Sequence, residues 1–257
     1  MSMIVFGNYA RYYNLLYRDK DYAGEAQFVR QLLETYAPNT KSILELGCGS
    51  GTHAMLLAKE GFNVHGVDAS THMLQQASDR LSQLPQELLS KLAFSHGDIR
   101  TIRLDQQFDA IISLFHVISY QTTNQDLQAA FATAKAHLKP GGVFIFVCWY
   151  GPTVRSDRPT VRIKRLEDNT ISITRICEPV MHPNDNLVDV NYQVLIKDKN
   201  SGVVEEIQET HQLRYLFKPE VDLLFTNSQL EPIEYREWMT NREPGFNTWG
   251  VYCVGRG

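Results

Sequence analysis

Ile43-Leu44-Glu45-Leu46-Gly47-Cys48-Gly49-Ser50-Gly51-Thr52 is the stretch that decides the fold, together with Val64-His65-Gly66-Val67-Asp68 further along the chain. Its first part is a short apolar run that ends in glycine, which predicts a buried strand rather than a helix. Glycines at alternate positions then turn the chain into a helical pattern that Gly61 ends. The second stretch predicts another strand, with Asp68 at its carboxyl end. This order predicts the first half of a nucleotide-binding α/β unit, whose ligands lie outside the carboxyl ends of the strands.

The spacing of the glycines distinguishes between two kinds of nucleotide site. A dinucleotide fingerprint, G-x-G-x-x-G, requires its third glycine at position 52, which is Thr52. The third glycine is Gly51 instead, and Glu45 stands two residues before the first one. The motif is therefore E-x-G-x-G-x-G. A glycine-rich turn in some other α/β protein is the alternative that the motif alone leaves open.

This motif resembles the first motif of the Rossmann-like S-adenosylmethionine (SAM) methyltransferases. The resemblance implies that the glycine turn approaches the amino-acid end of SAM and that Asp68 holds the two ribose hydroxyls. A carboxylate suits a vicinal diol because each oxygen can accept one O–H. The cofactor-binding positions implied in this part of the chain are Glu45, Gly47, Cys48, Gly49, Asp68 and Ala69.

Further cofactor contacts are implied where the next strands end. Gly97-Asp98-Ile99 follows a predicted strand at 92–96. In the resembled family, the aspartate of such a turn accepts a hydrogen bond from the adenine amino group, and the next residue packs on the ring. A plain turn is the alternative, since Gly-Asp is common in loops. Met73 lines either the core or the adenine pocket. Leu114 ends the predicted fourth strand, and the segment that follows it faces the methyl donor.

The segment after that strand carries two groups that can handle a proton. It reads Phe115-His116-Val117-Ile118-Ser119-Tyr120, and His116 and Tyr120 are the candidate catalytic residues. The pattern resembles the nucleotide-linked amino-sugar N-methyltransferases, and it lacks the Asn-Pro-Pro-aromatic run of enzymes that methylate nucleobases or protein amides. Simple packing against the N-terminal segment is the alternative for either side chain.

Residues 1–23 are unusually rich in aromatic side chains. A helix attached through its apolar stripe and a lid that closes the site against water both account for them. The segment is similar to that of the amino-sugar enzymes, although those usually have aspartate where this chain has Asn14. The resemblance places Tyr13 beside the cofactor and Tyr9 and Tyr17 beside the acceptor. The aromatic residues are Phe6, Tyr9, Tyr12, Tyr13, Tyr17 and Tyr22.

The fifth strand, residues 143–147, follows the tight turn Lys139-Pro140-Gly141-Gly142, which is common in SAM methyltransferases. Asn124 is expected to cap the helix before that turn. Related sugar-modifying enzymes often carry a carboxylate where the strand ends, and this chain does not. Trp149 and Tyr150 match the family's W-[WY]-x-P run and are expected to wall the acceptor site.

From residue 161 the pattern changes to strict alternation, which predicts an antiparallel sheet with one buried face. The resembled group inserts such a sheet here, where it covers the acceptor and often contacts a second subunit. The basic residues at its entrance form either a solvated face or a diphosphate site, because guanidinium matches phosphate bidentately. Arg155 is taken as the acceptor contact among them. These residues are Arg155, Arg158, Arg162, Lys164 and Arg165.

The predicted fold class is α/β: a Rossmann-like, seven-stranded methyltransferase sheet with helices on both faces and an inserted antiparallel β-sheet. Residues 1–150 form the lid and SAM-binding part, and residues 151–217 form the inserted sheet. Residues 218–257 complete the first part with a helix and two strands.

Composition restricts the partners. The 257 residues carry a net charge of −4 with no basic cluster, which argues against a nucleic-acid partner. No window of about 18 apolar residues and no signal peptide are present, so no membrane contact and a cytoplasmic location are expected. The four cysteines are far apart and the histidines lack ligand spacing, so no metal is expected. An exposed alternating sheet makes a homodimer plausible.

The predicted function is SAM-dependent methyl transfer to nitrogen or oxygen of a small-molecule acceptor, with a free or nucleotide-linked sugar as the leading class. A small amine or an amino acid is the alternative acceptor. A non-catalytic SAM-binding protein is a second class, which stable SAM binding without any methyl transfer would reveal.

Overall fold

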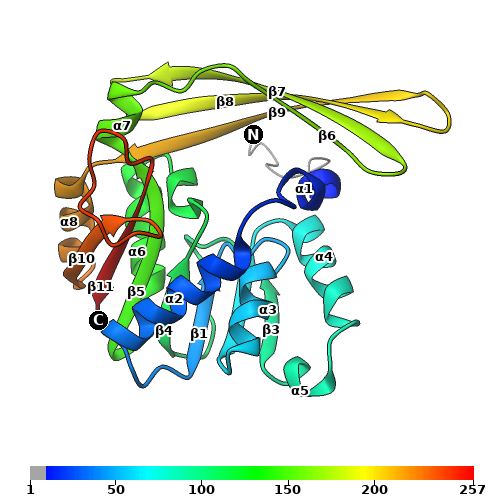
Figure 1. The fold of residues 1–257 in the computed structure, drawn as a ribbon. Coiled ribbons are helices and arrows are strands. Elements are labelled where there is room, and N and C mark those ends of the chain that lie inside the picture. The colour runs from blue at the N-terminus through cyan, green and yellow to red at the C-terminus, as the bar shows by residue number, and fades with distance from the viewer. Residues whose placement is uncertain (1–9) are drawn as a thin grey trace.

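The computed structural model describes residues 10–257, and its centre is a twisted sheet ordered β3-β2-β1-β4-β5-β11-β10 (Figure 1). All neighbouring strands are parallel except that β11 runs antiparallel to β5 and β10. This topology confirms the predicted seven-stranded arrangement. The strands are β1 (Ser42–Leu46), β2 (Asn63–Asp68), β3 (Leu92–His96), β4 (Phe108–Ser113), β5 (Leu138–Tyr150), β10 (Glu231–Glu237) and β11 (Gly250–Arg256).

Helices cover both faces of this sheet. On one face, α2 (Tyr22–Tyr36) and α3 (Thr52–Lys59) pack on Ala110 and Ile112 of β4. On the other, α6 (Asn124–His137) and α8 (Lys218–Asn227) pack on the intervening Ile111. The strand period of two thus divides the core into two layers. The other helices are α1 (Ala10–Leu16), α4 (Thr71–Leu81), α5 (Gln86–Leu89), α7 (Gly151–Ser156) and the 3-10 helix η1 (Val117–Tyr120).

The inserted sheet is an extension of the central one. Its strands are β6 (Arg162–Glu167), β7 (Ile171–His182), β8 (Leu187–Asp198) and β9 (Val204–Leu216). They are antiparallel to one another, and β9 joins β5 through Trp149↔Tyr215 and Tyr150↔Leu216. Figure 1 shows this sheet arching over the carboxyl ends of the central strands, with α1 beneath it. The predicted antiparallel sheet is therefore present.

Two local expectations were wrong. Thr123, not Asn124, caps α6: its backbone is extended and its hydroxyl oxygen accepts from the backbone N–H of Asp126 at 3.0 Å. The Lys139–Gly142 turn lies within β5 rather than before it. The register there steps from Phe108↔Leu138 to Ala110↔Val143, so the turn is an outward bulge.

Helix α1 joins the two sheets. Its Tyr12, Tyr13 and Leu16 share one buried cluster with Met73 of α4 and with apolar residues of β7, β8 and β9. Lys164 of β6 also donates to the carbonyl of Leu16 at 2.6 Å. The N-terminal segment thus packs through an apolar stripe, as one of its two interpretations predicted. Tyr9, expected beside the acceptor, lies outside the described residues, as does Phe6.

Residues 10–257 contain neither a membrane-spanning helix nor a cluster of metal-ligating side chains. None of the described helices has both the length and the apolar run needed to cross a membrane. No group of three or more His, Cys, Asp or Glu side chains in that range is placed to hold a metal ion.

Candidate functional site

The glycine turn is held by the end of β2. The backbone N–H groups of Gly47 and Cys48 both donate to the carbonyl of Val67, at 2.8 and 3.0 Å. Gly47 has φ +80°, and a Cβ there would lie 2.4 Å from Val117 of η1. Only glycine satisfies both the left-handed backbone and the close approach. The turn therefore brings the end of β1 against the segment that carries His116 and Tyr120.

Asp68 lies directly beyond this turn. One carboxylate oxygen accepts from the backbone N–H of Gly49 at 2.7 Å, and the other accepts from that of Ser70 at 2.8 Å. Burial raises the pKa of Asp68, while these two hydrogen bonds work in the opposite direction. The carboxylate is thus fixed in orientation at the carboxyl end of β2. A carboxylate can accept further O–H donors on its remaining lone pairs.

Glu45, on β1 before the turn, is almost completely buried. Burial, followed by the nearby charge of Asp68, raises its pKa to about 8. Its Oε2 atom has no hydrogen-bond partner among the described residues. A buried oxygen without a partner costs free energy unless a bound group supplies a donor. Glu45 therefore offers an acceptor atom inside the glycine turn.

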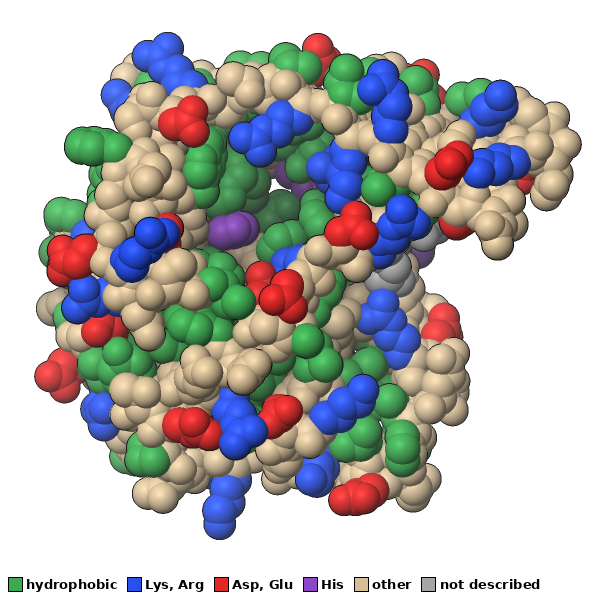
Figure 2. All heavy atoms as spheres, in the orientation of Figure 1, with side chains coloured by type: hydrophobic (Ala, Val, Ile, Leu, Met, Phe, Trp, Pro, Cys, Tyr) green, Lys and Arg blue, Asp and Glu red, His purple; other side chains and the backbone are tan. Residues whose placement is uncertain are grey.

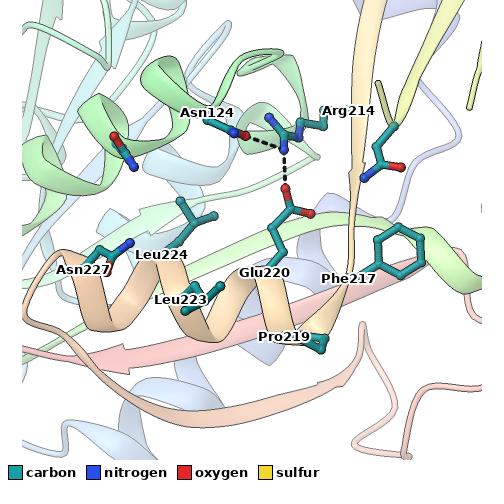
Figure 3. A pocket seen from close by; sticks show the side chains of 10 residues that line it. Asn124, Arg214, Phe217, Pro219, Glu220, Leu223, Leu224 and Asn227 are labelled. Carbon is teal, nitrogen blue, oxygen red and sulfur yellow. Dashed lines mark hydrogen bonds and ion pairs between the residues drawn. The ribbon is translucent and has the colours of Figure 1, made fainter. Parts of the chain in front are cut away.

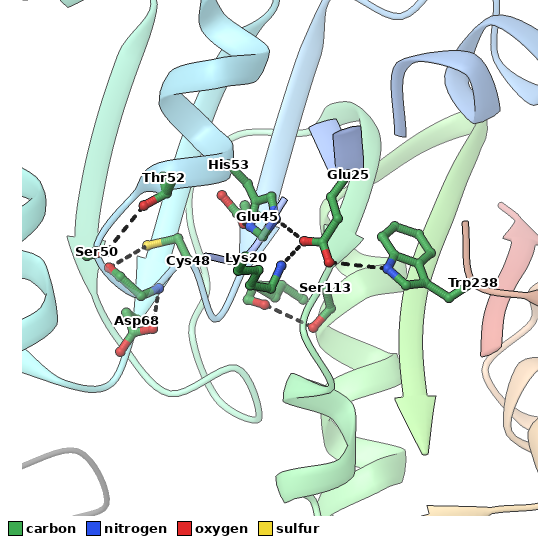
Figure 4. Close-up of polar contacts among 12 residues, drawn as sticks. Lys20, Glu25, Glu45, Cys48, Ser50, Thr52, His53, Asp68, Ser113 and Trp238 are labelled. Atoms are coloured by element: carbon green, nitrogen blue, oxygen red, sulfur yellow. Dashed lines mark hydrogen bonds and ion pairs between the residues drawn. The ribbon is translucent and has the colours of Figure 1, made fainter. Parts of the chain in front are cut away.

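A polar network that the sequence did not reveal adjoins Glu45 (Figure 4). Oε2 of Glu25 on α2 receives hydrogen bonds from Lys20 and from Nε2 of His53, the latter at 2.7 Å. Burial works to raise the pKa of Glu25, but these hydrogen bonds outweigh it and lower the pKa to about 2. Nδ1 of His53 lies 3.7 Å from Glu45, so the network connects α2 to the glycine turn. Nothing in the spacing of these residues along the chain predicts that they meet.

The residues expected around adenine come from the first turn of α4 and from the segment after β3. Ile99 and Met73 are buried, and Met73 lies against Gly49 of the glycine turn. The carboxylate of Asp98 is engaged by its own neighbour, because the Arg100 guanidinium donates to both of its oxygens. These hydrogen bonds lower the pKa of Asp98.

Three smaller positions complete this part of the cofactor side. The backbone N–H of Gly97 donates to the carbonyl of Asp68 at 3.0 Å, which ties the two strand ends together. Ala69 is exposed beside them, and Leu114 is buried at the end of β4. All the predicted cofactor positions in the Rossmann-like sheet therefore lie along its carboxyl edge.

The residues after β4 have strained backbones. Phe115 and His116 both have positive φ, 51° and 63°, which is uncommon for residues with a side chain. Nδ1 of His116 is buried without a partner among the described residues, and its ring lies 6.4 Å from that of Trp149. Burial lowers the pKa of His116 to about 4, so its imidazole is neutral at pH 7.

Tyr120, at the end of η1, reaches across to the inserted sheet. Its hydroxyl lies 2.9 Å from Nδ1 of His211 on β9, and Nε2 of His211 lies 3.1 Å from Glu209. His211 is buried. Burial raises the pKa of Tyr120 well above its usual value, and the nearby Tyr192 and Tyr17 raise it further. The sequence did not single out His211 and Glu209, because the alternating pattern of that strand indicates which residues are buried and not which of them contact Tyr120.

Aromatic rings connect the N-terminal segment, the residues after β4 and the inserted sheet. Tyr13 and Tyr17 of the N-terminal segment have ring centroids 4.6 Å apart, and Tyr17 meets Phe115 edge-on at 5.2 Å. The Arg175 guanidinium lies over the rings of Tyr17 and Tyr192. Figure 2 shows a hollow below the inserted sheet whose wall is mostly hydrophobic and includes histidine side chains. The candidate site is the region between the glycine turn, η1 and the inserted sheet, where η1 contacts both of the others.

The remaining predicted acceptor residues, Trp149, Tyr150 and Arg155, do not lie together in the structure. Trp149 packs on the same cluster as Tyr120, and its backbone N–H donates to Ser119. The next residue, Tyr150, packs into the opposite layer against Tyr235, because successive residues of a strand face opposite sides. Arg155 is exposed on α7, where it donates to the carbonyl of Pro183. The structure therefore brings Trp149 to Tyr120 but does not bring Tyr150 or Arg155 there.

A second cavity of about 490 Å³ lies between α6, α8 and the end of β9 (Figure 3). Its polar wall is a cluster in which buried Arg214 donates to Asn124 at 2.7 Å and pairs with Glu220. This cluster joins β9 to both helices. It contains none of the predicted site residues.

Comparisons with known proteins agree with this architecture. A family model described as "Methyltransferase domain" matches residues 43–142. The dTDP-3-amino-3,4,6-trideoxy-alpha-D-glucopyranose N,N-dimethyltransferase of Streptomyces venezuelae is 31% identical over 233 residues, which cover 90% of this chain and 92% of that protein.

Solved structures extend the likeness to the whole chain. The crystal structure of Streptomyces venezuelae DesVI superposes with a TM-score of 0.79 at 27% identity, covering 96% of this chain and 97% of that one. SAM-bound CalS10, an amino pentose methyltransferase from Micromonospora echinaspora, gives 0.75 at 25% identity with complete coverage of both chains. The chain belongs to the family of SAM-dependent methyltransferases that includes the Streptomyces venezuelae N,N-dimethyltransferase, and its cofactor is SAM.

Proposed function

We propose that the protein transfers the methyl group of SAM to the amino group of a nucleotide-linked sugar. The observation that carries the proposal is that a dTDP-amino-sugar N,N-dimethyltransferase matches this chain over 92% of its own length. The match therefore extends past the SAM-binding half into the inserted sheet. A small amine or amino acid would need no such cover, whereas a sugar nucleotide presents a long polar molecule to be enclosed.

The residues around the glycine turn fit the cofactor. Oε2 of Glu45 is a buried oxygen with no hydrogen-bond partner among residues 10–257, which suits the ammonium group of the methionine moiety. Gly47, Cys48 and Gly49 would border that end of SAM. The carboxylate of Asp68, with Ala69 beside it, would accept the ribose hydroxyls.

The adenine ring would lie between Met73 and Ile99, with Gly97 and Asp98 at its edge. Asp98 shares its carboxylate with Arg100, so it would receive the adenine amino group on a remaining lone pair. Leu114 and Tyr13 would close the pocket from the side of the methyl group.

When bound, SAM supplies a methyl group on a positively charged sulfur, which is already strongly electrophilic. The chain's own residues must therefore align the nitrogen lone pair and exclude water. The aromatic wall of Tyr17 and Trp149 suits both tasks, and Tyr9 is proposed to contribute from outside the described residues.

Tyr120 is the proposed catalytic residue that touches the acceptor. His116 is proposed to lie closer to the sulfur. Its pKa of about 4 makes it a weak base for an amine, whose own pKa is several units higher. The polar hydroxyl of Tyr120 is therefore the better candidate to contact the reacting nitrogen.

Roles for Arg155 and Tyr150 in the outer part of the acceptor site are proposed from their positions in the chain. Arg155 on α7 would meet the diphosphate at the rim, and Tyr150 would support Trp149 from behind. Within this proposal, residues 1–150 bind SAM and close the site, residues 151–217 cover the acceptor, and residues 218–257 complete the central sheet. The cytoplasm is the proposed location, because nucleotide-linked sugars and SAM are both made there.

A homodimer is also part of the proposal. Strand β6 is the outer edge of the inserted sheet, and Ile163 on it is 52% exposed. Unpaired sheet edges are favourable places for a second chain to pair. Analytical ultracentrifugation of the wild type and of Ile163→Lys tests this: a dimer that becomes monomeric supports it, and a monomeric wild type contradicts it.

A methyl-transfer assay tests the function. The purified protein and SAM are incubated with dTDP-linked 3-amino and 4-amino sugars, with the corresponding 3-hydroxy sugar and with glycine. We expect S-adenosylhomocysteine to form only with the amino sugars, together with the mass gain of one or two methyl groups. Equal turnover of the hydroxy sugar or of glycine would overturn the proposed acceptor class. SAM binding without turnover of any acceptor would favour a non-catalytic SAM-binding protein.

A further inference from the structure

Tyr120, His211 and Glu209 form a continuous chain of hydrogen-bonding atoms. The hydroxyl oxygen of Tyr120 lies 2.9 Å from Nδ1 of His211, and Nε2 of His211 lies 3.1 Å from Oε2 of Glu209. Tyr120 comes from η1 beside the glycine turn, whereas the other two residues come from β9. The chain of contacts therefore joins the SAM-binding half directly to the inserted sheet.

The direction of these hydrogen bonds follows from the chemistry of each group. A carboxylate can only accept, so Nε2 of His211 must carry the hydrogen that faces Glu209. A neutral imidazole then has a bare lone pair on Nδ1. Tyr120 must therefore donate its O–H to Nδ1. A hydroxyl oxygen that donates in one direction still has two acceptor lone pairs, so Tyr120 can accept an N–H from a bound amine.

Aromatic groups and one guanidinium face this chain of contacts from the described elements packed against it. Tyr192 of β8 meets the His211 ring edge-on at 5.0 Å, and the Arg175 guanidinium of β7 lies 5.0 Å from the centroid of the Tyr192 ring. The hydroxyls of Tyr17 and Tyr13 lie near that of Tyr120 from the N-terminal segment. His211 itself is only 3% exposed. Among the described residues, Glu209 is a carboxylate within hydrogen-bond distance of the imidazole.

We propose that His211 and Glu209 are positioning residues that make Tyr120 the proton acceptor for the sugar's amino group; this inference rests on the proposed function. A sugar amine reaches the site largely as an ammonium ion, which has no lone pair to attack a methyl group. One proton moves from the ammonium nitrogen to the oxygen of Tyr120 as the phenol proton moves to Nδ1 of His211. The resulting imidazolium is stabilised by Glu209.

Methyl transfer then follows with a balanced change of bonds. The freed nitrogen lone pair forms the new N–C bond, and the electrons of the broken C–S bond stay on sulfur. His211 returns its proton to solvent after the methylated product has left. Tyr120 ends the cycle as the neutral phenol with which it began.

The test compares wild type with His211→Phe in single-turnover methylation of a dTDP-linked amino sugar across a range of pH. At about pH 7 the variant should react roughly tenfold or more slowly, because the amine keeps its proton. At about pH 9.5 the amine is largely neutral in solution, and the deficit should shrink to roughly twofold. A purely structural role would leave the same deficit at every pH.

Glu209→Gln is the second variant, in case the larger change impairs folding. Its amide can donate to Nε2, which reverses the hydrogen bonds and turns the Tyr120 O–H toward the amine lone pair. We expect roughly a tenfold loss at neutral pH with an unchanged Kd for SAM. Glu206→Gln is the matched control, because Glu206 lies exposed on the same strand and should react like wild type.

The outcomes separate the two proposals. A wild type that methylates no amino sugar contradicts the proposed function itself. A wild type that methylates one, beside a His211→Phe variant with full activity or with a loss independent of pH, overturns only the role of His211. Recovery at high pH in that variant supports it.

Discussion

Nε2 of His53 lies 2.7 Å from Oε2 of Glu25, and this contact connects helix α2 to the helix that follows the glycine turn. Lys20 donates to the same carboxylate, and Nε1 of Trp238 lies 3.4 Å from its other oxygen. Glu25 thus connects the end of the N-terminal segment, the glycine-turn helix and the residue after β10. A single carboxylate holds three segments that are distant in sequence.

Glu25→Gln should destabilise the protein. The pKa of Glu25 is lowered from 4.5 to about 2, so its ionised form is favoured in the fold by about 3 kcal/mol. We expect Tm to fall by roughly 5–10 °C at pH 7. Glu34→Gln is the control, because Glu34 lies exposed on the same helix in an i,i+4 pair with Arg30. An equal Tm for the two variants would contradict this role of Glu25.

The lowered pKa of Glu25 determines how its contribution to the stability of the fold depends on pH. Because the pKa is lower in the folded state, the stabilisation is complete above the ordinary glutamate value and is lost as pH falls toward about 2. The difference in Tm between wild type and Glu25→Gln should therefore narrow between about pH 4.5 and pH 2. Differential scanning calorimetry over that interval measures it, and a constant difference would contradict the assignment.

Glu45→Gln should stabilise the protein without ligand, whereas Glu25→Gln should destabilise it. Burial raises the pKa of Glu45 to about 8, so the fold retains a proton that the unfolded chain loses above about pH 4.5. Stability from this group therefore falls as pH rises to about 8, and the glutamine variant avoids that loss.

We expect the Glu45→Gln variant without ligand to have a higher Tm at pH 8, by roughly 2–4 °C, and to bind SAM at least tenfold more weakly. Thermal melts and calorimetric titration measure the two effects. The control is Glu87→Gln on the exposed surface of α5. A variant that is both less stable and equally tight for SAM would contradict the assignment.

The sequence predicted the parts of the fold that depend on local chemistry. Gly47 needs a left-handed backbone, and Asp68 follows a strand whose end is marked by its own hydrophobic pattern. The pairs His53–Glu25 and Tyr120–His211 could not be predicted in this way. Their members are separated by 28 and 91 residues, and only the packing of helices and of the inserted sheet brings them together.

The sequence also could not predict fully which way the side chains of neighbouring residues point. Trp149 and Tyr150 form one motif, yet the strand period turns them to opposite layers. Arg155 lies in a helical turn that was not expected, and there it donates to a backbone carbonyl. The motif predicts that Trp149 and Tyr150 both line the acceptor site, but two successive residues of a strand cannot face the same side.

Asp68→Ala should abolish SAM binding while preserving the fold. The Asp68 carboxylate is aligned by the backbone N–H groups of Gly49 and Ser70, which leaves lone pairs for two ribose hydroxyls. Isothermal titration of SAM and S-adenosylhomocysteine should give micromolar binding in wild type and at least a hundredfold weaker binding in the variant. Unchanged affinity would remove Asp68 from the cofactor site.

Tyr120→Phe should lower turnover by tenfold or more and leave SAM affinity nearly intact. The change removes the hydroxyl that contacts His211 but keeps the ring in its aromatic setting. Steady-state kinetics with an amino-sugar acceptor measure the loss in kcat. Tyr36→Phe is the matched control, because the Tyr36 hydroxyl contacts Glu234 at the far end of α2. Unchanged turnover in Tyr120→Phe would contradict its catalytic assignment.

Gly47→Ala tests whether the glycine turn requires close approach or only an unusual backbone. Gly47 has φ +80°, and its new Cβ would lie 2.4 Å from Val117, immediately after His116. Gly141 has a similar φ of +76°, but a Cβ there meets nothing within 4 Å. Gly141→Ala therefore carries only the backbone cost, about 1 kcal/mol, and should retain SAM binding. Gly47→Ala must also displace η1, so we expect calorimetry to detect no SAM binding and the Tm to fall further. Equal effects of the two substitutions would mean that backbone conformation alone selects glycine at position 47.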